Sequence, residues 1–280
     1  MKKPDLHGGT LPLESDGQIY LIIHADDIGM CHSVNQASIK AFEMRIVSSG
    51  SIMVPCPWFA EAAAYFREHP EFDIGVHITL TSEWKLYRWP PVSSKEKVPG
   101  LVDPEGFLWR SSRDVAENAS AEEVEMEMRA QIERAVKFGV EFTHIDTHMG
   151  TVFFRREFSE AYVRLAEEYG VPALVRRDMS DLAQRVLKVS SQVPRFVHGI
   201  GKGTHEERMA WCQQVLKRLE PGLNEIILHL GGDDEEIKAV IGPDAFHRRS
   251  DFLIFSDPET WQIIREREMK IIGWRDLHKR

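Results

Sequence analysis

Short apolar runs alternate with helix-like segments along most of the chain, and this alternation limits the possible folds more than any other feature. The clearest runs are QIYLIIHA (18–25), IVSSGSIMV (46–54), FDIGVHITL (72–80) and NEIILHL (224–230). Continuous apolar runs of this length are typical of strands that are buried on both faces of a parallel sheet. Helix-like segments lie between them, among them 34–45, 58–68 and 120–138. Because parallel strands need crossover connections, the pattern predicts an α/β fold.

Weaker segments continue the same alternation towards the C-terminus. We predict further strands at 141–146, 173–176 and 195–198, and helices at 156–169, 179–189, 204–219 and 257–270. About seven strand–helix units follow one another without a change in composition or an internal repeat. Closing these units gives a barrel, and leaving them open gives a doubly wound sheet. We expect one domain over residues 1–280, with its core in 18–280.

Residues 82–113 break the alternation. This segment is rich in proline and glycine and contains Trp84, Trp89 and Trp109. A long connection without regular elements is either a functional loop at the rim of the fold or a surface excursion packed on it. The tryptophan rings suit sugar faces and ordinary packing equally well. The sequence leaves both interpretations of this rim excursion open.

Charge and cysteine usage exclude several classes of function. The chain has 35 basic and 44 acidic residues, a formal net charge of −9, which argues against a general nucleic-acid binder. Three widely spaced cysteines predict neither a disulfide framework nor a cysteine-type zinc site, and a reducing cytoplasm is the simplest compartment. No window approaches the length of apolar sequence that a membrane span needs, so we expect no membrane partner.

Carboxylates and imidazoles lie at the predicted ends of four different strands. They are Asp26 and Asp27 after the first strand, His77 in the third, Asp146 and His148 at 141–148, and His229 in the last strong strand. In parallel α/β folds the active residues gather at this edge of the sheet. Aspartate and histidine suit a divalent metal with open positions, which lowers the pKa of water and polarises a carbonyl group. Of two adjacent aspartates, one can bind the metal while the other accepts the proton from water.

Each of these residues also has a structural interpretation. An Asp-Asp pair at a strand end is commonly a helix cap or a turn, and His77 between two β-branched residues can be a satisfied core histidine. Asp146 either orients a ligand histidine or binds backbone groups. Asn35 is either a structural cap or an amide that orients the site. His24 and His144 lie earlier in their strands, where we expect polar groups of the barrel interior.

Four motifs, in order along the chain, resemble one known family. They are ADDIGMCHSVNQA (25–37), IGVHITLT (74–81), THIDTHMG (143–150) and EIILHLGG (225–232). Together they resemble the YdjC-like family of carbohydrate deacetylases, also called the ChbG/HpnK family. The first motif is the most specific, because Asp26-Asp27-x-Gly29 is followed by Asn35. The resemblance implies an irregular (β/α) barrel of about seven parallel strands, related to the polysaccharide deacetylases.

The resemblance also implies roles for single residues. Asp27, His77 and His148 would hold one divalent metal ion, Mg²⁺ or Zn²⁺. Asp26 would be the general base and His229 the general acid. Arg176 would position the base or the substrate, with Asp146 and Asn35 supporting the site. The implied partner is an N-acetylated carbohydrate, from which acetyl is removed, and homodimer formation is left open.

Two positions depart from the family pattern. The family commonly reads Asp-Ser-His-x-His, and Gly150 stands in the last position here; the usual His-Pro-Gly is His229-Leu230-Gly231. Gly150 therefore removes either a substrate contact or a metal ligand. We expect a metal-dependent hydrolase of linear amides, a carbohydrate deacetylase. The alternatives are a metal hydrolase of another amide or a phosphate ester, and a non-catalytic carbohydrate-binding homologue.

Overall fold

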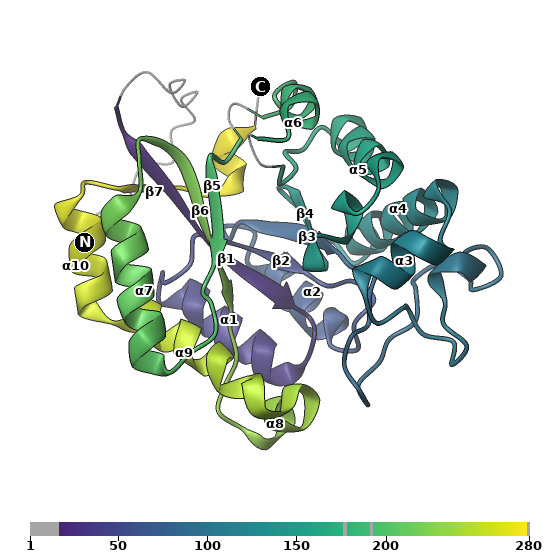
Figure 1. Ribbon diagram of the computed structural model, residues 1–280, viewed down its shortest axis with the longest axis horizontal. Coiled ribbons are helices and arrows are strands. Elements are labelled where there is room, and N and C mark those ends of the chain that lie inside the picture. Colours follow the sequence, from purple (N-terminus) through teal and green to yellow (C-terminus); the bar gives the residue numbers. More distant parts are fainter. Residues whose placement is uncertain (1–16, 176–177, 191–192, 279–280) are drawn as a thin grey trace.

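A single parallel sheet forms the centre of the molecule. The computed structural model describes residues 17–175, 178–190 and 193–278. The strands are β1 (Ile19–Ile28), β2 (Ser49–Ile52), β3 (Ile74–Ile78), β4 (Ile145–Thr147), β5 (Phe196–Gly199), β6 (Gly222–His229) and β7 (Lys270–Ile271). Their order is β4-β3-β2-β1-β6-β5, and β7 pairs with the start of β1 (Figure 1). The predicted α/β fold with about seven parallel strands is confirmed.

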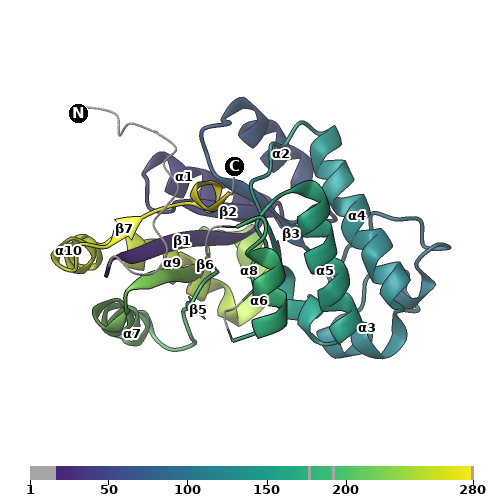
Figure 2. The ribbon, with the colours of Figure 1, turned by 90° about the horizontal axis from the view of Figure 1, so that it is seen from above.

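Helices connect the strands and surround the curled sheet (Figures 1 and 2). They are α1 (His32–Glu43), α2 (Phe59–Glu68), α3 (Ser112–Asn118), α4 (Ala121–Lys137), α5 (Arg156–Tyr169), α6 (Ser180–Val186), α7 (His205–Arg218), α8 (Glu235–Ile241), α9 (Ala245–Ser256) and α10 (Pro258–Glu266). A capping box of Ser120 and Glu123 begins α4, and Gly170 at φ +67° ends α5. Helices α3 and α9 were not predicted.

Two predicted elements near the sheet edge and the C-terminus differ from the structure. Of the strand expected at 173–176, the described residues show one parallel bridge, between Ala173 and Ile145, and residue 176 lies outside them. The helix expected to reach residue 270 ends at Glu266, since Glu268 takes a left-handed φ of +49°. The chain then forms β7. Among the described residues no ladder joins the two edge strands β4 and β5, so the barrel is open there.

Alternate side chains of β1 face two different environments. Leu21 and Ile23 belong to the large apolar cluster that the helices cover. Tyr20 and Ile22 belong to a second, smaller cluster with Trp274, inside the curl of the sheet. The two-residue period of a strand places His24 and Asp26 on this same inner face, nearer the carboxyl end. The inside of the barrel therefore changes from apolar to polar along β1, and the polar end carries the candidate site.

The rim excursion 82–113 has a packed core of its own. Trp89 is fully buried, and its indole N–H donates to the carbonyl of Thr81 at 2.9 Å. The indole N–H of Trp109 donates to the carbonyl of Gly100 at 2.8 Å. Trp89 is thus a structural residue of the excursion and is not available to stack on a sugar.

Cys31, Cys56 and Cys212 are buried and free. In the described ranges, no helix combines the length and the apolar character needed to span a bilayer.

Candidate metal and catalytic site

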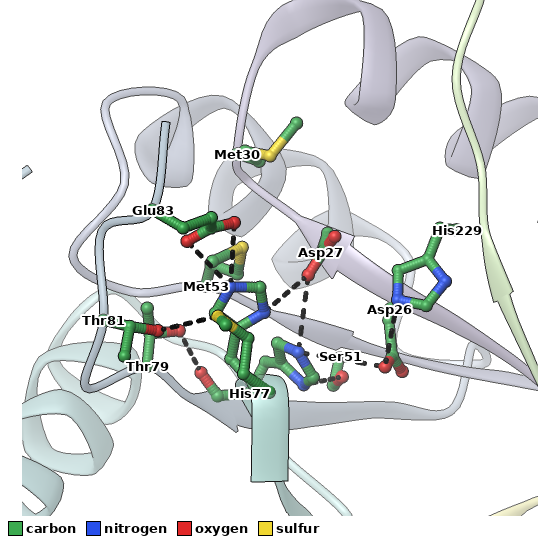
Figure 3. A network of polar contacts seen from close by, with 12 residues as sticks. Asp26, Asp27, Met30, Ser51, Met53, His77, Thr79, Thr81, Glu83 and His229 are labelled. Carbon is green, nitrogen blue, oxygen red and sulfur yellow. Dashed lines mark hydrogen bonds and ion pairs between the residues drawn. The ribbon is translucent and has the colours of Figure 1, made fainter. Parts of the chain in front are cut away.

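The end of β1 is irregular, and this turns its two aspartates in different directions. Pairing with β2 shifts register between Ala25 and Ile28, and Asp27 has a φ of +65°. A non-glycine residue seldom adopts this backbone conformation, which recurs at functional sites. As a result, the carboxylate of Asp27 lies beside His77 while that of Asp26 lies beside His229 (Figure 3).

Asn35 holds the turn that follows the two aspartates. Its Oδ1 accepts a hydrogen bond from the Gly29 N–H at 2.6 Å. Its Nδ2 donates to Glu61 at 2.7 Å and to the Trp58 carbonyl at 3.1 Å. The N-cap of α1 is Cys31, so Asn35 does not cap this helix. Its contacts fit an amide that orients the turn after Asp27.

Asp27, His77 and His148 come together although β1, β3 and the segment after β4 are far apart in sequence. Asp27 Oδ1 lies 3.4 Å from His77 Nε2 and 3.1 Å from His148 Nδ1. All three residues are buried, and their ligand atoms lie within 4.8 Å of one another. Among the described residues, Asp27 Oδ1 and His77 Nε2 have no hydrogen-bond partner. One carboxylate and two imidazoles with orphaned buried atoms fit a divalent cation.

Two further sets of histidine and aspartate meet the same spacing, His24–His144–Asp146 and Asp26–His77–Asp146. In both, the ligand atoms contact one another: His24 Nε2 lies 3.2 Å from Asp146 Oδ2, and His77 Nδ1 lies 2.9 Å from Asp146 Oδ1. His24 and His144 are fully buried inside the barrel, as predicted. Contacts of similar length join the atoms of the Asp27 set, so spacing alone does not separate the three sets. The Asp27 set is the one whose three residues the motif resemblance predicts as ligands.

Ser51 and Asp146 hold the far side of the His77 ring. His77 Nδ1 lies 3.0 Å from Ser51 Oγ and 2.9 Å from Asp146 Oδ1. This leaves Nε2 facing Asp27, and the arrangement is typical of a carboxylate that orients a metal-binding histidine. Of the two interpretations of Asp146, the structure favours the orienting one. Burial lowers the pKa of His77, but Asp146 and Asp26 raise it well above its usual value.

Sequence reasoning missed Arg248, which reaches the site from α9. Its Nη2 donates to Asp27 Oδ2 at 2.6 Å, and its side chain is only 8% exposed. Burial raises the pKa of Asp27, but the charges of Arg248 and His148 outweigh it and hold this pKa well below the usual range. Nothing local distinguishes Arg248 from its neighbour Arg249, so no sequence signal pointed to it.

Asp26 lies in a different electrostatic environment from Asp27. Its Oδ1 is 3.3 Å from His24 Nε2, and its Oδ2 is 3.9 Å from both His77 Nε2 and His229 Nε2. Burial raises the pKa of Asp26 to about 6, although His77 acts in the opposite direction. Two adjacent aspartates thus have pKa values that are moved apart, a pattern typical of separate catalytic roles.

His229 is the accessible member of the site. Its side chain is 43% exposed, and its backbone N–H donates to Asp251 Oδ2 at 2.9 Å. Asp251 is in turn held by a buried ion pair with Arg208. The end of β6 is therefore anchored while the imidazole faces the open side.

Glu83, in the rim excursion, was also missed. Its two carboxylate oxygens lie 3.1 and 3.2 Å from His148 Nε2. Gly150 lies just beyond His148 in a kink where Met149 and Gly150 both take left-handed φ values, +54° and +62°. A Cβ at Gly150 would meet only Phe153, at 3.8 Å, so the position is open. Arg176 lies outside the described residues.

The sequence matches a known protein family and several named proteins. The family described as "YdjC-like protein" matches residues 20–266. A "Carbohydrate deacetylase" of Thermus thermophilus is 33% identical over 260 residues, which is 89% of this chain and 91% of that protein. A "Chitooligosaccharide deacetylase" of Yersinia enterocolitica is 29% identical over 212 residues, 74% of this chain and 78% of that protein.

Solved structures show the same architecture. One from Enterococcus faecalis, named as a cellobiose-phosphate cleavage protein, has a TM-score of 0.80 and 26% identity and covers 94% of this chain and 100% of that one. The lactam utilization protein of Thermus thermophilus has a TM-score of 0.51 at 12% identity, covering 91% of this chain and 100% of that one. The second likeness concerns the fold alone.

Proposed function

Since the chain belongs to the YdjC-like protein family, we propose that it is a metal-dependent hydrolase that removes acetyl from an N-acetylated sugar or oligosaccharide. The observation that carries this proposal is the meeting of Asp27, His77 and His148 at one point beside Asp26. The relatives that match over most of the chain are named carbohydrate deacetylases, which supports the substrate class.

Asp27, His77 and His148 would hold the ion. Two imidazoles and one carboxylate suit Zn²⁺ well, while Mg²⁺ prefers oxygen ligands and usually keeps several waters. When bound, a divalent ion lowers the pKa of water and polarises a substrate carbonyl. Arg248 would hold the second oxygen of Asp27, so that Oδ1 stays directed at the two histidines.

Asp26 would be the general base. At neutral pH a carboxyl with a pKa of about 6 is mostly ionised, and it can accept the proton of the attacking water. His24, at 3.3 Å, holds this carboxylate on the inner face of β1. The water oxygen then attacks the acetamide carbonyl carbon, and the C–N bond breaks as acetate forms.

His229 would be the general acid. The leaving nitrogen needs a proton, and the half-exposed imidazole of His229 lies on the other side of Asp26 from His77. An exposed donor can meet a substrate that enters from solvent, whereas the buried histidines cannot. The products are acetate and a free amino sugar.

The rim excursion would shape substrate choice. The hydroxyl of Tyr87 donates to the Met30 carbonyl at 2.7 Å, so this segment lies on the turn that follows Asp27. This contact, together with that between Glu83 and His148, supports a role in setting the size of the accepted oligosaccharide. The exposed side chain of Leu86 lies in the same segment.

Acetate release is the direct test. We would incubate the protein with N-acetylglucosamine and its short oligomers in the presence of Zn²⁺, Mg²⁺ or a chelator. We expect release that depends on metal and is lost in H77Q. The matched control is H69Q, because His69 is partly exposed, stacks on Tyr65 and forms its ion pair in the described part of the chain with nearby Glu71.

Three outcomes would contradict the proposal. Release that survives both chelation and H77Q would exclude the metal mechanism. A folded, metal-loaded protein that releases no acetate from any of these sugars would favour another amide or a phosphate ester. Sugar binding without turnover on any such substrate would favour a non-catalytic homologue.

A further inference from the structure

We propose that Glu83 is a positioning residue of the metal site: it orients the His148 ring so that Nδ1 is the ligand atom, and it thereby makes the rim excursion part of the metal centre. This inference rests on the proposed metal site and concerns a residue outside the four motifs of the sequence. It assigns to the excursion a task besides the shaping of substrate choice.

The contact between Glu83 and His148 is direct and well shielded. Both carboxylate oxygens lie near Nε2, at 3.1 and 3.2 Å, and the Glu83 side chain is only 18% exposed. The other ring nitrogen, Nδ1, lies 3.1 Å from Asp27 Oδ1. Glu83 holds the ring at Nε2, which carries the proton that Glu83 accepts, and this leaves Nδ1 facing Asp27 Oδ1.

The excursion holds the backbone on both sides of Glu83. The Ser82 N–H donates to the Trp109 carbonyl at 2.8 Å, and Ser82 Oγ accepts from the Trp89 N–H at 2.9 Å. After Glu83, the Trp84 carbonyl accepts from Arg110 at 2.6 Å. Residues from the far end of the excursion therefore fix the place from which Glu83 reaches His148.

The two histidines of the site are held by carboxylates at different ring nitrogens. Asp146 holds His77 at Nδ1 and leaves Nε2 towards Asp27, whereas Glu83 holds His148 at Nε2 and leaves Nδ1. A carboxylate on the distal nitrogen fixes the tautomer of a ligand histidine and makes it a stronger ligand. Asp146 belongs to the third motif and to β4, but Glu83 comes from the excursion, and its role follows only from the fold.

The first experiment measures Zn²⁺ affinity by competition with a chromophoric chelator in the full-length protein. We expect E83A to weaken Zn²⁺ binding by about 10–100-fold, which is the usual effect of removing such a partner. E83Q should lose less, because its amide oxygen still accepts the Nε2–H bond. E105Q is the matched control, since Glu105 lies in the same excursion and its side chain is 66% exposed; its carboxylate pairs with the buried Arg88 and the partly exposed Arg110.

The second experiment identifies the ligand nitrogen. In protein with ¹⁵N-labelled histidine, long-range ¹H–¹⁵N spectra with Zn²⁺ should show Nδ1 of His148 bound and Nε2 protonated. In E83A this signature should be lost or mixed. We expect the near-UV circular dichroism of metal-free E83A to match that of the metal-free wild-type. If Glu83 had only a structural role, its loss would disturb the packed tryptophans of the excursion and change this spectrum.

The outcomes separate this inference from the proposed function. Neither measurement involves a substrate. If the wild-type binds Zn²⁺ but E83A binds it equally well, or if His148 binds through Nε2, the role of Glu83 is refuted while the metal site stands. If E83A and E83Q both change the near-UV circular dichroism of the metal-free protein and both weaken Zn²⁺ binding, Glu83 is a structural residue and the inference fails. A wild-type protein that binds no Zn²⁺ overturns both.

Discussion

Replacing Arg248 with methionine tests how the buried charge of Asp27 is balanced. Arg248 Nη2 lies 2.6 Å from Asp27 Oδ2, and the two side chains are 8% and 1% exposed. Methionine retains most of the apolar volume of the side chain but removes the positive charge. In the metal-free protein, Asp27 then keeps only the neighbouring histidines as compensation.

Breaking a buried ion pair by removing one partner costs about 3–5 kcal/mol, because the remaining charge stays buried. We expect a loss of this size for R248M in the presence of a chelator. With a denaturant slope of about 3 kcal/mol per molar urea, the midpoint should fall by about 1–1.7 M. A divalent ion on Asp27 restores positive charge there, so the difference from wild-type should shrink at saturating Zn²⁺.

Urea unfolding followed by tryptophan fluorescence, with and without Zn²⁺, measures both effects. The matched control is R249M, whose guanidinium lies over the Phe252 ring at 5.3 Å and which should cost less than about 1 kcal/mol. R248M/D27N should be more stable than R248M without metal, because the uncompensated charge is gone. The reasoning is refuted if R248M and R249M lose equal stability in chelator, or if Zn²⁺ leaves their difference unchanged.

Three further predictions concern other groups of the site. Asp26→Asn should lower kcat about 10²–10⁴-fold with Zn²⁺ affinity nearly unchanged, and a variant that keeps its kcat would remove Asp26 as the base. His229→Gln should lower kcat most for substrates whose amine is a poor leaving group, and an equal loss of kcat for all leaving groups would contradict its role as acid. Burial raises the pKa of Glu225 from its ordinary value of 4.5 to about 8, so between these two pH values the native state holds a proton that the unfolded state has lost. Stability of the metal-free protein should therefore fall with rising pH, by up to about 1.4 kcal/mol per unit, and Glu225→Gln should flatten this slope; a wild-type already flat in this window would refute it.

Local sequence patterns were enough to predict the main strands and the residue types that form the site. The apolar runs at 18–25 and 224–230 became β1 and β6 because continuous burial on both faces needs apolar side chains at every position. Asp26, His77 and His229 were predicted at one edge because parallel strands bring their carboxyl ends together. The structure places all three at this edge, with His77 Nε2 and His229 Nε2 each 3.9 Å from Asp26 Oδ2.

Other parts of the site depend on contacts between distant segments. Arg248 meets Asp27 across 221 positions, and Glu83 meets His148 across 65. Neither residue carries a local signal, since a buried arginine in a helix and a glutamate in a loop have the same sequence context as surface ones. The pairing of β1 with β6, which brings His229 beside Asp26, is likewise set by the sheet order.

By itself, the sequence determined the α/β class, the strand edge that carries the site and the residue types available for chemistry, because periodicity and burial act over a few neighbouring residues. Only the tertiary structure decided which carboxylate faces which imidazole. The left-handed φ of Asp27 and the register shift in β1 turn Asp27 towards His77 and His148 and leave Asp26 on the inner face. These directions arise from packing between β1, β3, α9 and the rim excursion, and such packing is a property of the whole chain.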